Sequence, residues 1–126
     1  MSTVVPTIVR FAIEEFIREL PPAGAVPVPI GEPIPKIRSK RVVIPTKLDT
    51  KIGVWECSPG RFRRQVVQAE FCHFLEGECT FTPDAGEAFQ IRPGDVVYFP
   101  PKSSGVWEIK TASRKVFMVF DSVGSS

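Results

Sequence analysis

Proline interrupts this chain so often that it limits the folds available. Thirteen of the 126 residues are Pro and nine are Gly. Because proline has no backbone N–H and clashes with the preceding helical turn, this spacing excludes a bundle of long helices. It favours short strands that are joined by turns. A chain of this length is expected to form one domain around a single core.

The first forty residues have the features of an arm rather than of a core. Apolar residues recur at helical spacing from Phe11 to Leu20, which predicts one short amphipathic helix that ends before Pro21. Six prolines in 21–35 predict an extended segment that cannot be a central strand, because proline lacks the ladder donor. We therefore divide the chain into an N-terminal arm at 1–40, a barrel domain at 41–121 and a flexible tail at 122–126.

Short β-branched and aromatic runs alternate with turn residues from residue 41 onward. Turns are indicated at Ser58-Pro59-Gly60, Glu76-Gly77, Pro83–Gly86 and Arg92–Asp95. Eight or nine short strands at this spacing predict an all-β protein, either an antiparallel sandwich or a small closed barrel. The predicted strands are 41–44, 51–57, 63–69, 70–75, 78–82, 88–91, 96–99, 106–109 and 115–120.

Charge is small overall but uneven along the chain. The 16 basic and 14 acidic residues leave a net charge of +2, which does not argue for binding to nucleic acid. Nine basic and two acidic residues lie in 36–64, whereas 70–95 carries six acids and one arginine. Such a distribution is typical of solvated faces that complement each other in the fold, with a site for an anionic ligand as the alternative.

The cysteines and the apolar runs bear on the cellular compartment. Cys57, Cys72 and Cys79 form no CxxC pair, and no apolar run has the length of a secretory leader or of a membrane span. We therefore expect a cytoplasmic protein with reduced cysteines and no contact with the membrane.

Two segments resemble the double motif of the cupin superfamily. They are Glu70–Glu78 (EFCHFLEGE) and Ile91–Pro100 (IRPGDVVYFP). The segments 53–60 and 105–108, each with a Gly-Val-Trp-Glu sequence, are similar to the branch of small cupins named after (S)-ureidoglycine aminohydrolase, which resembles the cupin domain of ethanolamine-utilisation proteins. The resemblance covers residues 51–120. It implies an antiparallel jelly-roll barrel with a small-molecule site inside it, and a homodimer.

The metal ligands of many cupins are largely missing from this sequence. In that superfamily, two His and a Glu of the first motif and one His of the second commonly hold a divalent metal. The resemblance puts Glu70 at the Glu position and Gly105 at the second-motif His position. The other two His positions fall on Arg63 and Gln65, or with a shorter spacing on Arg64 and Val66. One carboxylate cannot complete a shell for Fe, Ni or Zn, so we predict neither a metal nor another cofactor.

Strand alternation decides which neighbours of Glu70 share its surroundings. If Glu70 points into the barrel, Cys72 shares its face, while His73 points outward as a packed or interface histidine. A less usual metal site built from Glu70, Cys72 and Cys57 is the alternative to a metal-free interior.

Glu70 is the first candidate for catalysis. An inward carboxylate in an apolar barrel is expected to have a raised pKa and to act as a general acid or base. The alternative is a structural salt bridge with Arg63, Arg64 or Lys115. Cys72 is the second candidate, a nucleophile if a nearby cation lowers its pKa and otherwise a buried filler.

Aromatic and basic side chains are the candidates for ligand binding. Trp55, Tyr98 and Trp107 are the predicted walls of a pocket, because aromatic rings bury flat or apolar ligands. Arg63 and Lys115 are the predicted partners of an anionic ligand. Core packing or surface exposure is the alternative for each of them.

Three functional hypotheses follow from these features. The first is a cupin-fold protein that binds a small molecule, or a metal-independent acid/base enzyme, with its pocket centred on Glu70. The second is a metal-dependent aminohydrolase-like enzyme that acts on a ureido or amino acid substrate. The third is a non-catalytic, dimeric assembly module in which the arm and its helix dock on a partner subunit. The residues leave open whether the protein is an enzyme.

Overall fold

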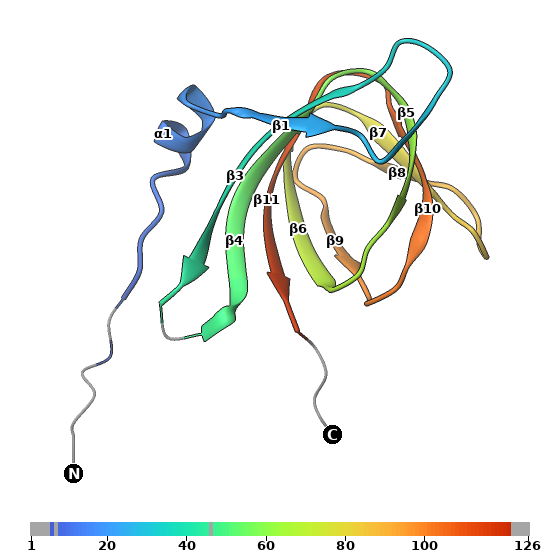
Figure 1. Cartoon of the computed structure of the whole chain (residues 1–126). Coiled ribbons are helices and arrows are strands. Elements are labelled where there is room, and N and C mark those ends of the chain that lie inside the picture. The colour runs from blue at the N-terminus through green and yellow to red at the C-terminus, as the bar shows by residue number, and fades with distance from the viewer. Residues whose placement is uncertain (1–5, 7, 46, 122–126) are drawn as a thin grey trace.

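Two antiparallel β-sheets face each other and enclose the core (Figure 1). The computed structural model describes residue 6 and residues 8–45 and 47–121. The strands of the six-stranded sheet are, in order across it, β1 (Pro22–Ala25), β3 (Lys36–Ile44), β4 (Lys47–Cys57), β11 (Ser113–Phe120), β6 (Ala69–Glu76) and β9 (Val96–Phe99). The strands of the five-stranded sheet are β2 (Val28–Ile30), β5 (Gly60–Gln65), β10 (Ser104–Ile109), β7 (Cys79–Pro83) and β8 (Phe89–Ile91).

The all-β, jelly-roll prediction is confirmed by this architecture. Each predicted strand has a counterpart. The predicted turn at Arg92–Asp95 lies between strands, and that at Ser58-Pro59-Gly60 lies at the junction of β4 and β5, with Gly60 as the first residue of β5. Several boundaries differ, since β3, β4, β5, β10 and β11 each begin two to five residues earlier than predicted. Residues 66–68 connect β5 to β6, where a strand was predicted to continue to 69. There the Val66 N–H leaves the ladder and donates to the carbonyl of Ser103 over 2.7 Å.

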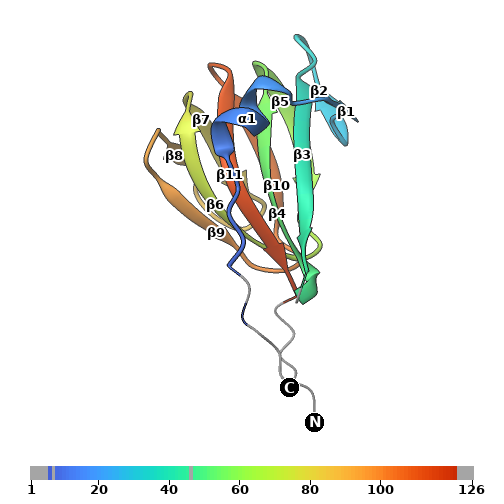
Figure 2. The ribbon, with the colours of Figure 1, turned by 90° about the vertical axis from the view of Figure 1, so that its left-hand side faces the viewer.

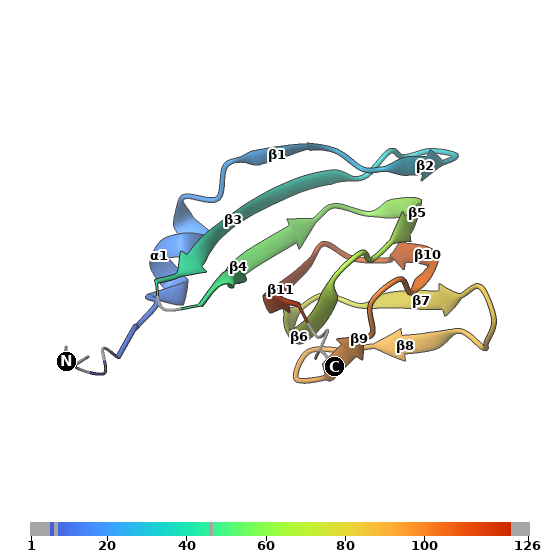
Figure 3. The ribbon, with the colours of Figure 1, turned by 60° about the horizontal axis from the view of Figure 1, so that its bottom comes forward.

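The proline-rich arm belongs to the sheets and does not lie apart from them. β1 pairs with β3 and β2 pairs with β5, so the segment passes from an edge of one sheet to an edge of the other (Figure 3). An edge strand has a neighbour on one side only, so the missing N–H of a proline can face away from that neighbour without breaking the ladder. The prediction of an extended segment outside the central strands is therefore confirmed. β3 begins at Lys36, ahead of the predicted domain boundary at 41.

The N-terminal helix packs on the outer face of the six-stranded sheet (Figure 2). α1 spans Ile13–Arg18 and is shorter than the predicted segment from Phe11 to Leu20. Ala12 at its N-cap offers no side-chain acceptor, so no side-chain hydrogen bond stabilises the first turn. The ammonium group of Lys40 on β3 lies 5.1 Å from the centroid of the Phe16 ring. These contacts attach the helix to its own barrel.

Two further predictions concern the chain ends and the membrane. The predicted flexible tail at 122–126 lies outside the described residues, as do 1–5 and 7 of the arm. No helix within the described ranges has the length and apolarity needed to cross a membrane.

Aromatic side chains fill much of the space between the sheets. Alternation along the strands turns every second side chain inward, and Trp107, with 1% exposure, lies among four other rings. Its centroid is 4.9 Å from that of Phe81, 5.7 Å from that of Phe99 and 6.1 Å from those of Phe74 and Trp55. The interior beside β3 and β5 is less completely filled, and two hollows lie there.

Candidate functional site

A buried ion pair lies at the centre of the interior. The Nζ atom of Lys115 on β11 donates a hydrogen bond to Oε2 of Glu70 on β6 over 2.8 Å, and the two side chains are 1% and 3% exposed. The register of β11 and β6 places Lys115 opposite Phe74 and Glu70 opposite Val119. The two long side chains therefore extend toward each other along the sheet. The small side chain of Cys72 lies beside them, and its thiol also donates a hydrogen bond to Glu70.

Aromatic rings surround the ammonium group of Lys115. Its Nζ atom lies between 4.6 and 6.0 Å from the ring centroids of Trp55, Trp107, Phe74, Phe99 and Phe117. Attraction of a desolvated cation to a ring face is worth about 2 kcal/mol. The ring faces and the carboxylate together compensate the cost of removing this charge from water.

The protonation of Glu70 differs from the prediction. Burial raises its pKa, but the charges of Lys115 and Arg64 and the hydrogen bonds from Lys115 and Cys72 outweigh burial and lower the pKa to about 2. The expectation of a raised pKa is therefore wrong, because two cations at this carboxylate outweigh its burial, and the salt bridge weighed as the alternative is the one that forms. The salt bridge with Lys115 and Arg64 is the arrangement present, with Arg64 Nη2 3.2 Å from Glu70 Oε1. Glu70 is ionised at neutral pH and has little tendency to take up a proton.

Cys72 is buried beside the Glu70 carboxylate. Its Sγ atom donates to Glu70 Oε2 over 3.1 Å. Burial raises the pKa of the thiol, and although Lys115 opposes this effect, the charge of Glu70 adds to it and the pKa reaches about 12. The condition for a nucleophile, a thiol pKa lowered by a nearby cation, is therefore not met. Cys57 and Cys79 are also buried and free, and burial raises the pKa of each thiol.

Two hollows lie between the sheets beside β3 and β5. The larger has a volume of about 240 Å³ and is lined mainly by small and apolar side chains, with Trp55 and Phe62 as its aromatic rings. The smaller has a volume of about 150 Å³ and is lined in part by Glu70. Arg41 and Arg64 line both hollows. The Glu70 side of the ion pair therefore borders an open hollow.

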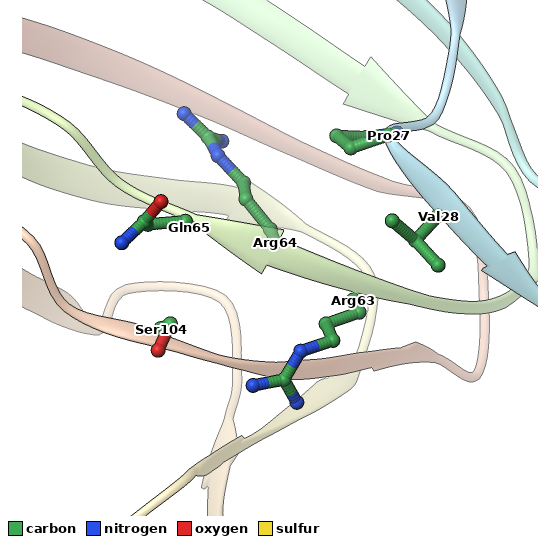
Figure 4. Close-up of a pocket in the computed structure, with 6 residues that line it drawn as sticks. All are labelled: Pro27, Val28, Arg63, Arg64, Gln65 and Ser104. Atoms are coloured by element: carbon green, nitrogen blue, oxygen red, sulfur yellow. The ribbon is translucent and has the colours of Figure 1, made fainter.

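A third hollow lies at β5 beside the arm, and its volume of about 390 Å³ exceeds that of either hollow between the sheets. It is lined by Pro27, Val28, Arg63, Arg64, Gln65 and Ser104 (Figure 4). Arg63 and Arg64 point to opposite sides of β5. Arg63, predicted to bind an anionic ligand, is turned outward, is 46% exposed and forms an ion pair with Asp84. Arg64 is turned inward because adjacent residues of a strand face opposite sides.

The structure separates the three predicted aromatic walls. Trp55, 5% exposed, lines the larger hollow, whereas Trp107 lies within the core. The Nε1 atom of Trp107 is a buried donor that has no acceptor among the described residues. Tyr98 is 51% exposed and pairs with Phe71 on the outer face of the sheet, because it alternates with the inward side chain of Phe99. The placement of Tyr98 in the pocket wall is therefore wrong.

The side chains around Glu70 do not fit the metal of many cupins. Arg64 and Val66 are turned toward the interior, while Arg63 and Gln65 are exposed, so the shorter of the two motif spacings applies. A cation and an aliphatic side chain thus occupy the two His positions. A guanidinium group offers only donors and cannot ligate a metal.

Gly105 is equally unsuited to the second-motif ligand. A Cβ atom at this position would overlap the carbonyl oxygen of Thr82 and lie 2.7 Å from Cζ of Phe81. In the part of the chain that the structure describes, no three His, Cys, Asp or Glu side chains are grouped so that they could hold a metal ion. A metal site built from Glu70, Cys72 and Cys57 also conflicts with Lys115, whose ammonium group donates a hydrogen bond to the same carboxylate.

Sequence reasoning missed Arg41 and Phe62 as lining residues and assigned Arg64 only to a salt bridge. The inward direction of Arg64 could have been predicted from the sequence. If Phe62 on β5 is buried, alternation along the strand turns Arg64 inward as well. Arg41 carried no such signal. Its guanidinium carbon lies 5.5 Å from the centroid of the Phe117 ring, and only the pairing of β3 with β4 brings it there.

Fold and site together define a cupin without the usual metal ligands. The chain belongs to the family of EutQ-like cupin domains, whose model matches residues 49–117. A search among curated proteins found no match.

Several solved structures share the fold. A DUF861-family protein of unknown function from Pseudomonas syringae pv. tomato is 23% identical, with a TM-score of 0.71, and the match covers 80% of this chain but only 44% of that one. The EutQ protein of Clostridium difficile is 13% identical, with a TM-score of 0.62 and coverages of 75% and 77%. A putative ethanolamine utilization protein Q from Salmonella typhimurium is 21% identical, with a TM-score of 0.59 and coverages of 68% and 69%. At these identities the likeness shows the fold.

Removal of Lys115 is expected to destabilise the protein strongly. The variant Lys115→Met leaves the Glu70 charge buried with a single remaining cation, which should lower the free energy of unfolding by about 3–5 kcal/mol. The measurement is urea-induced unfolding at neutral pH. Because the two groups compensate each other, the double variant with Glu70→Gln should lose less than the sum of the single losses.

Arg63→Met is the matched control, since it removes an exposed ion pair with Asp84 and should cost less than about 1 kcal/mol. The account of the interior is contradicted if Lys115→Met costs no more than this control.

Proposed function

We propose that this EutQ-like cupin domain binds a small molecule between its sheets without a metal ion. The observation that carries the proposal is the pair of hollows at Arg41 and Arg64, where fixed cations and the rings of Trp55 and Phe62 face an accessible space. Pockets for drug-sized ligands have volumes of roughly 300–1,000 Å³. The two volumes of about 240 and 150 Å³ suit a ligand of metabolite size.

The site supports binding better than acid/base catalysis. A general base works best when its pKa lies near the operating pH. The pKa of Glu70 is lowered to about 2, and that of Cys72 is raised to about 12, so neither group is adjusted to proton transfer or nucleophilic attack at neutral pH. Glu70 instead holds the cations in place.

The residues give less support to a metal-dependent aminohydrolase. That reaction class uses a metal to activate water, which requires several ligands and an open coordination position. Here Arg64, Val66 and Gly105 stand at three of the four ligand positions that the resemblance indicates.

Ligand binding in the absence of metal is the first test. Protein treated with EDTA is screened against small organic acids, amides, alcohols and amines, with and without added Mn²⁺. Trp55 and Trp107 are the two tryptophans of the chain and give two indole N–H signals in NMR spectra. We expect at least one compound to raise the melting temperature and to move the Trp55 signal whether or not Mn²⁺ is present.

Trp55→Phe serves to assign the two signals. The proposal fails if no compound has an effect at millimolar concentration, or if every effect requires the metal.

Self-assembly through the outer face of the six-stranded sheet is a second candidate function. The register of β11, β6 and β9 aligns Met118, Phe71 and Tyr98 in one row. Phe71 is 42% and Tyr98 51% exposed, and neighbouring Val96 is 56% exposed. Contiguous apolar surface of this kind is typical of interaction sites. The outward His73 lies beside this row, opposite Val96, where a homodimer would cover it.

The molar mass in solution tests this second candidate. Light scattering on the full chain should give the mass of a dimer, and Tyr98→Glu should convert it to a monomer because a charge would be buried in the contact. Leu48→Glu, which charges an exposed apolar residue at the start of β4, is the control and should stay dimeric. A monomeric wild type would exclude assembly as the function.

A further inference from the structure

We propose that the ligand of this site is a small carboxylate, clamped between the guanidinium groups of Arg41 and Arg64. The inference rests on the proposed binding function and names the chemical class of the ligand. Arg41 comes from β3 in the six-stranded sheet and Arg64 from β5 in the five-stranded sheet. They are the residues that both hollows share, so they stand where the larger hollow adjoins the smaller.

Both guanidinium groups keep donors available for a ligand. Each carries five N–H donors in a planar fork that matches the two oxygens of a carboxylate. Arg64 uses Nη2 for Glu70 Oε1, 3.2 Å away, and its side chain is 24% exposed. Within the described ranges Arg41 has no carboxylate partner, and it stacks on the ring of Phe117. Neither arginine is fully occupied by the protein.

The charges around the hollows leave a positive excess. Lys115, Arg64 and Arg41 face one carboxylate, that of Glu70. Lys51, in register with Val119, is also on the inward face of β4 and adds a further positive charge. Because the partly buried Arg64 lies where the dielectric is lower than that of water, it attracts an anion more strongly than a cation at an open surface does. A ligand with one negative charge reduces this excess.

The walls of the larger hollow indicate what carries the carboxylate. Trp55 and Phe62 offer ring faces, and Ile37, Ala23 and Ala25 add aliphatic surface. A short apolar or flat body fits such walls, and a highly charged body such as a phosphate ester would lose hydration without replacement. The clamp therefore favours a monocarboxylate with a compact apolar substituent.

The test compares carboxylates with their uncharged isosteres. Acetate and acetamide, benzoate and benzamide, and phenylacetate and phenylacetamide are titrated into the 15N-labelled full chain, with inorganic phosphate as a further probe. The Trp55 indole N–H signal reports occupancy of the larger hollow. We expect at least one acid to bind tenfold or more tightly than its amide, and more tightly than phosphate.

Arginine variants locate the binding. Arg64→Gln and Arg41→Gln should each weaken the acid at least tenfold and leave the amide unchanged. Arg41 is exposed and outside the ion-pair network, so its variant keeps the test valid if Arg64→Gln fails to fold. Arg63→Gln, on the same strand with its side chain on the opposite side, is the control and should bind the acid as the wild type does.

The possible failures are distinguishable. If amides or phosphate move the Trp55 signal as strongly as the acids do, or if the acid binds both arginine variants with wild-type affinity, the carboxylate clamp is refuted while small-molecule binding stands. If no probe moves the Trp55 signal, the clamp is refuted, and the proposed binding function is overturned as well when the wider screen of alcohols and amines also has no effect.

Discussion

The buried pair of Lys115 and Glu70 is the interaction on which the interior depends. An ammonium group without water needs a counter-charge and polarisable neighbours. The pairing of β11 with β6 supplies the carboxylate, and Trp55 on β4 and Trp107 on β10 are among the rings around the ammonium group. The same pair keeps Glu70 ionised, and burial keeps Cys72 a thiol. The groups that look reactive in the sequence therefore serve charge compensation, and the open side of the interior is left to Arg41 and Arg64.

A protein cation stands beside the motif carboxylate in a fold that often places a metal there. Lys115 and Arg64 supply fixed positive charge at Glu70, and Phe81 occupies the space that a side chain at Gly105 would need. The two kinds of charge differ in chemistry. A metal accepts lone pairs and activates water, whereas a guanidinium group donates directed hydrogen bonds to an anion. The residues at these positions therefore support the proposed recognition of negative charge better than they support activation of water.

Local signals predicted the strands, because turn residues such as Ser58-Pro59-Gly60 and side-chain alternation act over a few positions, and the cupin motifs predicted how the strands assemble. The protonation of Glu70 could not be predicted in that way. It depends on Lys115, which lies 45 positions further along the chain, and on how two charges outweigh burial. Arg41 and Arg64 belong to different sheets, so only the assembled fold brings them to the same hollows.

The protonation of Glu70 tests the central claim most directly. In 13C-labelled protein, the chemical shift of the Glu70 side-chain carboxyl carbon, assigned with Glu70→Gln, reports its charge as the pH is lowered. The pair of Lys115 and Arg64 predicts a midpoint of about 2, well below the ordinary value of 4.5. A midpoint at or above 4.5 in the folded protein would show that burial dominates, and would contradict an interior organised by a compensated ion pair.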